Sequence, residues 1–88
     1  MDNQRYFVYG KSSCSYCVSA KHILVSLNKD FVFYDFEEDP EFLDYTKKFY
    51  RYPTVPIIVK NDKETGLCSL IGGFGEFSQL LGVSVNEA

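Results

Sequence analysis

The chain alternates short apolar runs with segments whose apolar residues recur every three or four positions. The short runs predict four strands, at residues 5–9, 31–36, 57–59 and 67–71. The second run is almost entirely apolar, so we expect it at the centre of a sheet. Turn residues Asn61, Asp62 and Gly66 lie between the last two runs, which predicts that these strands form a hairpin.

Three segments have helical spacing. The first begins at the hydroxyl side chains of residues 12–15 and runs to about Asn28. Its expected buried stripe is Cys17, Ala20, Leu24 and Leu27. The second begins at Asp39 and Pro40, which suit a helix start. Its expected buried stripe is Phe42, Tyr45 and Phe49. The last, short helix carries Phe74, Phe77 and Leu81.

The predicted order β-α-β-α-β-β-α describes one α/β domain over residues 1–88, with 83–88 as a frayed tail. Helical crossovers join the first three strands, and the hairpin completes a mixed four-stranded sheet. The apolar fraction of 45%, with eight Phe and seven Tyr, is enough to fill a core under that sheet.

Charge and composition exclude several classes of function. The net charge of −3, without a basic cluster, argues against a nucleic-acid partner. No apolar run is long enough to span a membrane. The polar residues 1–5 lack the apolar segment of a signal peptide, and we expect a cytoplasmic protein. Three cysteines, an odd number, fit a reducing compartment better than a disulfide framework.

The candidate chemistry lies between the first strand and the first helix. Cys14 and Cys17 are separated by two residues, and this placement predicts a redox dithiol. Unpaired N–H groups and the helix dipole favour a negative charge at a helix N-terminus. The thiolate is the nucleophile in disulfide exchange. Cys17 shares the core-facing stripe, whereas Cys14 precedes the first turn and is expected to face solvent.

Two further motifs accompany the dithiol. Thr54-Val55-Pro56 precedes the third strand, and a cis peptide before Pro56 would present the backbone groups of Val55 to an extended substrate. The segment Gly72-Gly73-Phe74-Gly75-Glu76 precedes the last helix. Glycines there allow a ligand to approach the backbone closely, and the N–H groups of the helix start suit an anion.

Together, these three motifs resemble those of glutaredoxins over roughly residues 5–82. The resemblance implies a three-layer, thioredoxin-like fold and a glutathione-dependent thiol–disulfide oxidoreductase. Cys14 would attack protein disulfides or glutathione mixed disulfides, and Cys17 would be the resolving thiol. Glutathione would be the co-substrate, with no metal required. The expected partners are disulfide-containing or glutathionylated proteins, among them ribonucleotide reductase, and a monomer is expected.

The resemblance also implies a glutathione-binding site. Lys11 would bind the glycine carboxylate and help hold the Cys14 thiolate, while Tyr16 flanks the tripeptide. Val55, between Thr54 and Pro56, would pair its backbone with the cysteinyl part. Backbone N–H groups at Gly72 and Gly73, next to Phe74, would take the γ-glutamyl carboxylate, and Glu76 would meet the γ-glutamyl ammonium. These residues are Lys11, Tyr16, Thr54, Val55, Pro56, Gly72, Gly73, Phe74 and Glu76.

The chain departs from the common family pattern at four points. Ser15 replaces the usual proline of the motif. Gly75 stands where Asp or Thr is frequent. Pro53 stands where many relatives carry Arg, a position for which nearby Arg51 is a candidate substitute. The hairpin of residues 60–70 is longer than usual and contains Cys68.

Ser15 keeps a second class of function open, because some glutaredoxins without that proline bridge a [2Fe–2S] cluster as a dimer with the help of glutathione thiols. In this chain, Cys14 would be the cysteine that binds such a cluster. Pro53 and Gly75 keep a third open, a glutaredoxin-like donor reduced by thioredoxin reductase. Cys14 and Cys17 together with Cys68 and His22 would give the four ligands of a structural zinc site. Such a site is disfavoured, because the sequence has no second pair of ligands at the short spacing typical of zinc sites.

Plain structural roles compete with each assignment. If the dithiol were absent, Lys11 would be interpreted as an ordinary surface lysine. Tyr16 could serve only to fill the core, and Glu76 could serve only to complement the dipole of the last helix. His22 is expected at a solvent-facing position rather than as a catalytic base. Cys68 is expected to be a half-buried strand residue.

Overall fold

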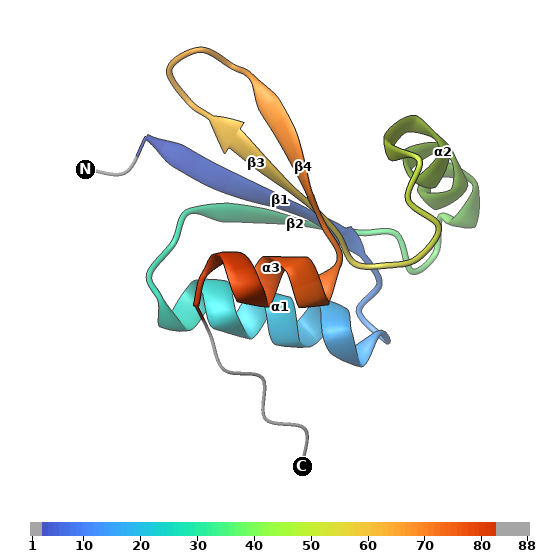
Figure 1. Ribbon diagram of the computed structural model, residues 1–88. Helices are drawn as coiled ribbons and strands as arrows, with labels where there is room; N and C mark the ends of the chain where they lie inside the picture. Colours follow the sequence, from blue (N-terminus) through green and yellow to red (C-terminus); the bar gives the residue numbers. More distant parts are fainter. Residues whose placement is uncertain (1–2, 83–88) are drawn as a thin grey trace.

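The computed structural model describes residues 3–82 and has the predicted order of elements (Figure 1). The elements are β1 (Gln4–Gly10), α1 (Ser15–Ser26), β2 (Phe31–Asp35), α2 (Pro40–Tyr50), β3 (Ile57–Asp62), β4 (Cys68–Gly72) and α3 (Phe74–Leu80). The tail predicted at 83–88 lies outside the described residues. No helix in the described part of the chain is long and apolar enough to cross a membrane.

The four strands form one mixed sheet in the order β2-β1-β3-β4. β1 pairs in parallel with β2 and antiparallel with β3, and β3 and β4 form the expected hairpin. The central position predicted for residues 31–36 is therefore wrong, because β2 is an edge strand. Its apolar character has another cause: Phe31 and Phe33 pack against the core, whereas Val32 and Tyr34 face the opposite side and are partly exposed.

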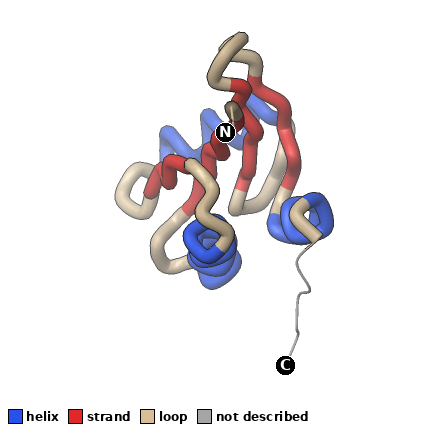
Figure 2. The backbone as a smooth tube through the Cα atoms, turned by 90° about the vertical axis from the view of Figure 1, so that its left-hand side faces the viewer, coloured by secondary structure: helices blue, strands red, loops and turns tan. Residues whose placement is uncertain are grey.

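α1 and α3 lie side by side on one face of the sheet (Figures 1 and 2). The core between them and the strands contains Tyr6, Val8, Ala20, Leu24, Ile58 and Phe77. Tyr6 and Phe77 meet edge to face with ring centroids 6.2 Å apart. Alternate residues of β1 point to this side, as the period of a strand requires.

The stripe predicted for the first helix is correct for three of its four members. Cys17, Ala20 and Leu24 have no exposed surface. Leu27 is 42% exposed, so its predicted burial is wrong. The reason is local, since Leu27 is the C-cap of α1 and the following residue, Asn28, has a positive φ of 56° that turns the chain away.

The stripe predicted for the second helix is wrong. Phe42, Tyr45 and Phe49 are 56%, 74% and 76% exposed, and the helix buries Leu43 and Thr46 instead. The helix is thus rotated by one residue from the predicted orientation. α2 lies at one end of the sheet, on the side opposite α1 and α3, where the Tyr50 ring contacts Tyr9.

Aromatic rings contact one another beside the exposed face of α2. Tyr9 stacks on Tyr34 with centroids 5.0 Å apart, and Phe36 contacts Phe42 at 5.1 Å. An open, mostly apolar hollow of about 360 Å³ remains between α2 and Tyr9. The exposed aromatic residues of α2 line this hollow instead of filling a core.

Cys68 begins β4 and is exposed, so its expected half-burial is wrong. The side-chain amide of Asn61 donates to its sulfur at 3.3 Å. β4 is the other edge of the sheet, and a residue at the start of an edge strand has fewer neighbours to cover it.

Gly10 ends β1 directly behind Cys17, and this close approach generates a prediction. A β-carbon at Gly10 would collide with Cys17 Sγ and lie 3.1 Å from Cys17 Cβ. We expect Gly10→Ala to lower the free energy of unfolding by about 1–3 kcal/mol, the usual cost of overpacking a core. Urea unfolding of the purified variants measures this change.

Gly75→Ala is the matched control. A β-carbon there would meet no heavy atom within 4 Å outside its chain neighbours and its own helix backbone. Because alanine is favoured over glycine in helices by roughly 1 kcal/mol, this variant is expected to be as stable as the wild type or slightly more stable. Equal stability of the two variants would contradict the packing of Gly10 on Cys17.

Candidate active site

Cys14 is the N-cap of α1, at the end of the loop that follows β1. Its N–H donates to the Lys11 carbonyl at 3.1 Å, and its own carbonyl accepts from Val18 N–H at 3.0 Å. The Cys14 sulfur accepts a hydrogen bond from the N–H of Cys17 at 3.4 Å. The cap therefore uses a sulfur where other helices use an oxygen, and it directs a backbone donor at the atom that would carry negative charge as a thiolate.

Cys17 lies one turn further along and has no exposed surface. Burial, together with its hydrogen bond to Cys14, raises the pKa of the Cys17 thiol to about 12. Cys14 is half-buried, and both cysteines are free thiols. Of these two sulfur atoms, only that of Cys14 is accessible from solvent.

Two carboxylates, one at the last residue of β2 and one just after the strand, hold the loop before Cys14. Asp35 Oδ1 accepts from the backbone N–H of Ser12 at 3.1 Å. Glu37 Oε1 accepts from the N–H of Ser13 at 2.9 Å. The N–H of Glu37 also donates to Asp35 at 3.0 Å, which links the two carboxylates into one network.

The charges of this network are shifted toward the ionised forms. Hydrogen bonds from the side chain and backbone of Ser13 lower the pKa of Glu37, and the positive charge of Lys11 adds to this effect. Partial desolvation would raise the pKa of Asp35, but hydrogen bonds from Glu37 and Ser12 outweigh it and lower that pKa. The positive charge of Lys11 therefore acts on Glu37.

The sequence reasoning did not find Asp35 and Glu37. A signal was nevertheless present, because parallel neighbouring strands end at the same edge of a sheet. Asp35 ends β2 and Glu37 lies just after it, while Ser12 and Ser13 lie just after β1. His22, considered as a base, is exposed on α1, as expected.

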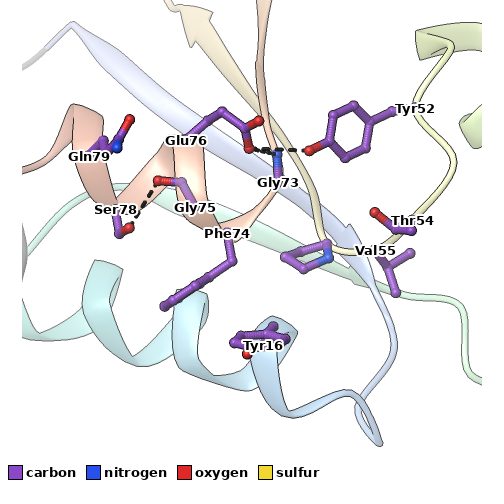
Figure 3. A pocket seen from close by; sticks show the side chains of 11 residues that line it. Tyr16, Tyr52, Thr54, Val55, Gly73, Phe74, Gly75, Glu76, Ser78 and Gln79 are labelled. Atoms are coloured by element: carbon purple, nitrogen blue, oxygen red, sulfur yellow. Dashed lines mark hydrogen bonds between the residues drawn. The ribbon is translucent and has the colours of Figure 1, made fainter. Parts of the chain in front are cut away.

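A groove of about 570 Å³ lies next to the dithiol loop (Figure 3). Three separate segments supply its walls: the start of α1, the loop before β3 and the first turns of α3. It brings together seven predicted binding residues: Tyr16, Thr54, Val55, Pro56, Gly73, Phe74 and Glu76. Lys11 and Gly72 are not among the lining residues, while Tyr52, Gly75, Ser78 and Gln79 join the predicted set.

Two aromatic rings form one wall of the groove. Tyr16 and Phe74 face each other with centroids 5.3 Å apart and an interplanar angle of 37° (Figure 3). Tyr16 is 58% exposed, so it is not core filler. Across the groove, the Val55–Pro56 peptide bond is cis, as the sequence predicted, and Val55 is half-buried.

The other wall carries a carboxylate with two donors. Oε1 of Glu76 accepts from Gly73 N–H at 2.9 Å and from the Tyr52 hydroxyl at 3.2 Å. Hydrogen bonds from the backbone N–H groups of Glu76 itself and of Gly73, and then from Tyr52, lower the pKa of Glu76. The sequence predicted that the Gly73 N–H donates a hydrogen bond to a ligand carboxylate. In the structure it donates to the carboxylate of Glu76 instead.

The turn before α3 depends on glycine. Gly72 has a φ of 129°, a backbone conformation that residues other than glycine rarely adopt. It is buried beside Glu76. Arg51, the candidate substitute for the cation missing at Pro53, does not line the groove. Both lie with Tyr52 around a separate hollow beside the end of α2.

The carboxylate network predicts acid sensitivity. Because the folded pKa values of Asp35 and Glu37 are lowered, their stabilisation is complete above the unfolded pKa values of about 4. It is lost as the pH falls through the lower folded values. We expect Glu37→Gln to flatten the loss of stability below about pH 4.5, as measured by urea midpoints from about pH 6 to about pH 2.

Glu38→Gln is the control for this experiment, since Glu38 takes no part in the network described above. This variant should keep the pH dependence of the wild type. A slope unchanged in Glu37→Gln would show that the carboxylate does not hold the loop through its charge.

Comparison with known proteins agrees with this geometry. The family model described as Glutaredoxin matches residues 7–64. A wheat glutaredoxin crystal structure aligns with a TM-score of 0.71 at 21% identity, covering 88% of this chain and 70% of that one. Glutaredoxin 1 from Francisella tularensis, complexed with cacodylate, aligns at 0.62 with 26% identity, covering 90% and 93%.

A mutant of the thioredoxin-like protein BC3987 also aligns, with a TM-score of 0.61 and 24% identity, covering 96% of this chain and 100% of that one. A search of curated proteins gave no significant match. The structural neighbours share the thioredoxin-like fold, and the family model spans more than half of the sequence, including both cysteines and the Thr54-Val55-Pro56 motif. The chain belongs to the glutaredoxin family.

Proposed function

We propose that this protein is a glutathione-dependent thiol–disulfide oxidoreductase in which Cys14 is the nucleophile and Cys17 the resolving thiol. One observation carries the proposal. The Cys14 sulfur caps α1 and accepts the Cys17 N–H, half-exposed above a thiol that has no exposed surface. Reactive cysteines are those at helix N-termini with access to solvent, whereas buried thiols with raised pKa values are inert toward outside reagents.

With a glutathione mixed disulfide, the reaction uses Cys14 alone. The Cys14 thiolate attacks the glutathione sulfur, a new S–S bond forms, and the substrate thiolate leaves and takes up a proton. The thiolate of a second glutathione then attacks the glutathione sulfur on Cys14. Oxidised glutathione leaves, and the Cys14 thiolate is restored. One reduced glutathione is consumed per turnover, since the other half of the oxidised glutathione comes from the substrate mixed disulfide, and the substrate sulfur leaves as a thiol.

With a protein disulfide, Cys17 completes the exchange. Cys14 attacks one substrate sulfur and releases the other as a thiolate. Cys17 must then lose its proton and attack the Cys14 sulfur, which frees the second substrate thiol and closes a Cys14–Cys17 disulfide. The raised pKa of Cys17 means that this step needs a proton acceptor. The departing substrate thiolate can fill that role. Two glutathione molecules then reduce the disulfide, within the potentials of roughly −200 to −230 mV usual for glutaredoxins.

The groove supports glutathione as the reductant. Tyr16 and Phe74 form an apolar wall beside the dithiol, and Val55 lies opposite with backbone groups suited to an extended peptide. Glu76 provides a negative charge for the γ-glutamyl ammonium. Since Gly73 N–H already serves Glu76, we assign the Gly72–Gly73 turn the role of placing this carboxylate. Lys11, held in the loop, remains the cation proposed for the glycine carboxylate.

The protein substrate stays a prediction from the sequence, with ribonucleotide reductase and glutathionylated proteins as candidates. The same holds for the monomeric state and the cytoplasmic location. No described contact specifically favours the two other functions, a [2Fe–2S] carrier that uses Cys14 with glutathione thiols or a donor reduced by thioredoxin reductase. Residues 3–82 contain no group of three or more His, Cys, Asp or Glu side chains placed to hold a metal ion.

Coupled turnover tests the proposal. The protein is mixed with reduced glutathione, glutathione reductase, NADPH and a small glutathione mixed disulfide, and NADPH loss is followed. We expect Cys14→Ser to abolish turnover, because it removes the nucleophile. Cys17→Ser should retain turnover on this substrate but lose activity on a protein disulfide, because only the second reaction needs a resolving thiol.

Ser19→Ala, on α1 outside the dithiol and the groove, is the control and should behave as the wild type. Absence of turnover by the unmutated protein would overturn glutathione dependence. In that case, reduction by thioredoxin reductase and anaerobic reconstitution of a cluster would be measured next.

A further inference from the structure

We propose that Tyr52 is a positioning residue that holds the Glu76 carboxylate in the groove, and that this contact sets the preference for thiols bearing the amino group of glutathione. The inference rests on the proposed function and adds a residue that the sequence motifs do not contain. Tyr52 acts through Glu76 and takes no part in the thiol chemistry.

Tyr52 is fixed before any ligand arrives. It follows Arg51, the C-cap of α2, whose φ of 54° turns the chain back, and the Tyr52 N–H donates to the Lys47 carbonyl at 2.9 Å. Tyr52 lines the groove, and its hydroxyl reaches Glu76 on α3 (Figure 3). A residue of the connection between α2 and β3 is thereby linked to the first turn of α3.

The Glu76 carboxylate receives two donors on one oxygen. Gly73 N–H comes from the turn at the start of α3, and the Tyr52 hydroxyl comes from the α2–β3 connection. Glu76 itself is an exposed side chain on the first turn of a short helix, where it has rotamer freedom to lose. Without the Tyr52 bond, the only donors to the carboxylate are the backbone N–H groups of Gly73 and of Glu76 itself, which belong to one turn. The hydroxyl adds a donor from a second element and thereby restricts the orientation of the carboxylate.

Close packing shows that the turn is built around the tyrosine ring. A β-carbon at Gly73 would lie 2.6 Å from the Tyr52 hydroxyl oxygen and 3.3 Å from a ring carbon. Any other residue at Gly73 would displace the hydroxyl from Glu76. Gly73 is therefore needed here for the approach of a side chain of the protein, in addition to any approach by a ligand.

The electrostatics explain what the held carboxylate selects. Among the residues that line the groove, Glu76 alone carries a formal charge at neutral pH. Desolvation and the bond to Glu76 raise the pKa of Tyr52, so its hydroxyl remains a donor. Glutathione has one ammonium group, on its γ-glutamyl residue. A carboxylate held in one position stabilises the binding of that ammonium group, and it does not stabilise the binding of a thiol that lacks it.

The test is Tyr52→Phe, which keeps the ring against Gly73 and removes only the donor. Two small mixed disulfides are compared in the coupled assay: one of glutathione, and one of the analogue in which glutaric acid replaces the γ-glutamyl residue and the amino group is absent. For the glutathione substrate we expect KM to rise roughly three- to tenfold with kcat unchanged, because a charge-assisted but partly exposed hydrogen bond is lost. For the analogue we expect both constants to be unchanged.

Tyr45→Phe is the matched control, because it removes a hydroxyl from an exposed tyrosine on α2 that lies outside the groove. It should leave both substrates unaffected. If Tyr52→Phe impairs the two substrates equally, or impairs neither, the positioning role is overturned while the proposed function stands. If the wild-type protein turns over neither mixed disulfide, the proposed function fails and this inference fails with it.

Discussion

The site depends first on the burial of Cys17 behind Gly10. This contact seats the first turn of α1 against the end of β1, and it is close enough that even a methyl group on Gly10 has no room. With Cys17 in the core, the geometry of an N-cap leaves Cys14 outside it, three residues earlier and pointing its sulfur at the Cys17 N–H. The difference between an accessible thiol and a buried one is thus a consequence of packing one helix end.

The sheet topology supplies the remaining supports of the dithiol loop. Parallel pairing of β1 with β2 brings the ends of the two strands to the same edge, so Asp35 and Glu37 can accept hydrogen bonds from the N–H groups of Ser12 and Ser13. These bonds satisfy a backbone that has no strand or helix partner. They also place negative charge next to the dithiol, where the Asp35 carboxylate adds to burial and the Cys14 contact in raising the pKa of the Cys17 thiol. The positive charge of Lys11 lowers the pKa of Glu37.

Segments that are remote in sequence supply different parts of the groove. Tyr16 on α1 and Phe74 on α3 provide an apolar surface, and the loop before β3 provides backbone N–H and C=O groups. Its single charged residue, Glu76, is held from a third direction by Tyr52. α2 contributes through this connection rather than through its own aromatic face. Phe42, Tyr45 and Phe49 stay exposed, because the helix turns Leu43 and Thr46 toward the sheet.

The sequence by itself determined the order of elements, the dithiol, the cis proline motif and the glycine turn. Each of these is encoded locally, by periodicity, capping residues or turn chemistry. Only the tertiary structure decided that β2 is an edge strand, which face of α2 is buried, and that Leu27 and Cys68 are exposed. It alone brought Asp35 to Ser12 and Tyr52 to Glu76. An apolar run looks the same whether it is buried between two strands or stacked beside aromatic rings at an edge. A hydrogen bond between residues 23 or 24 positions apart has no local signature, because it depends on how the elements pack.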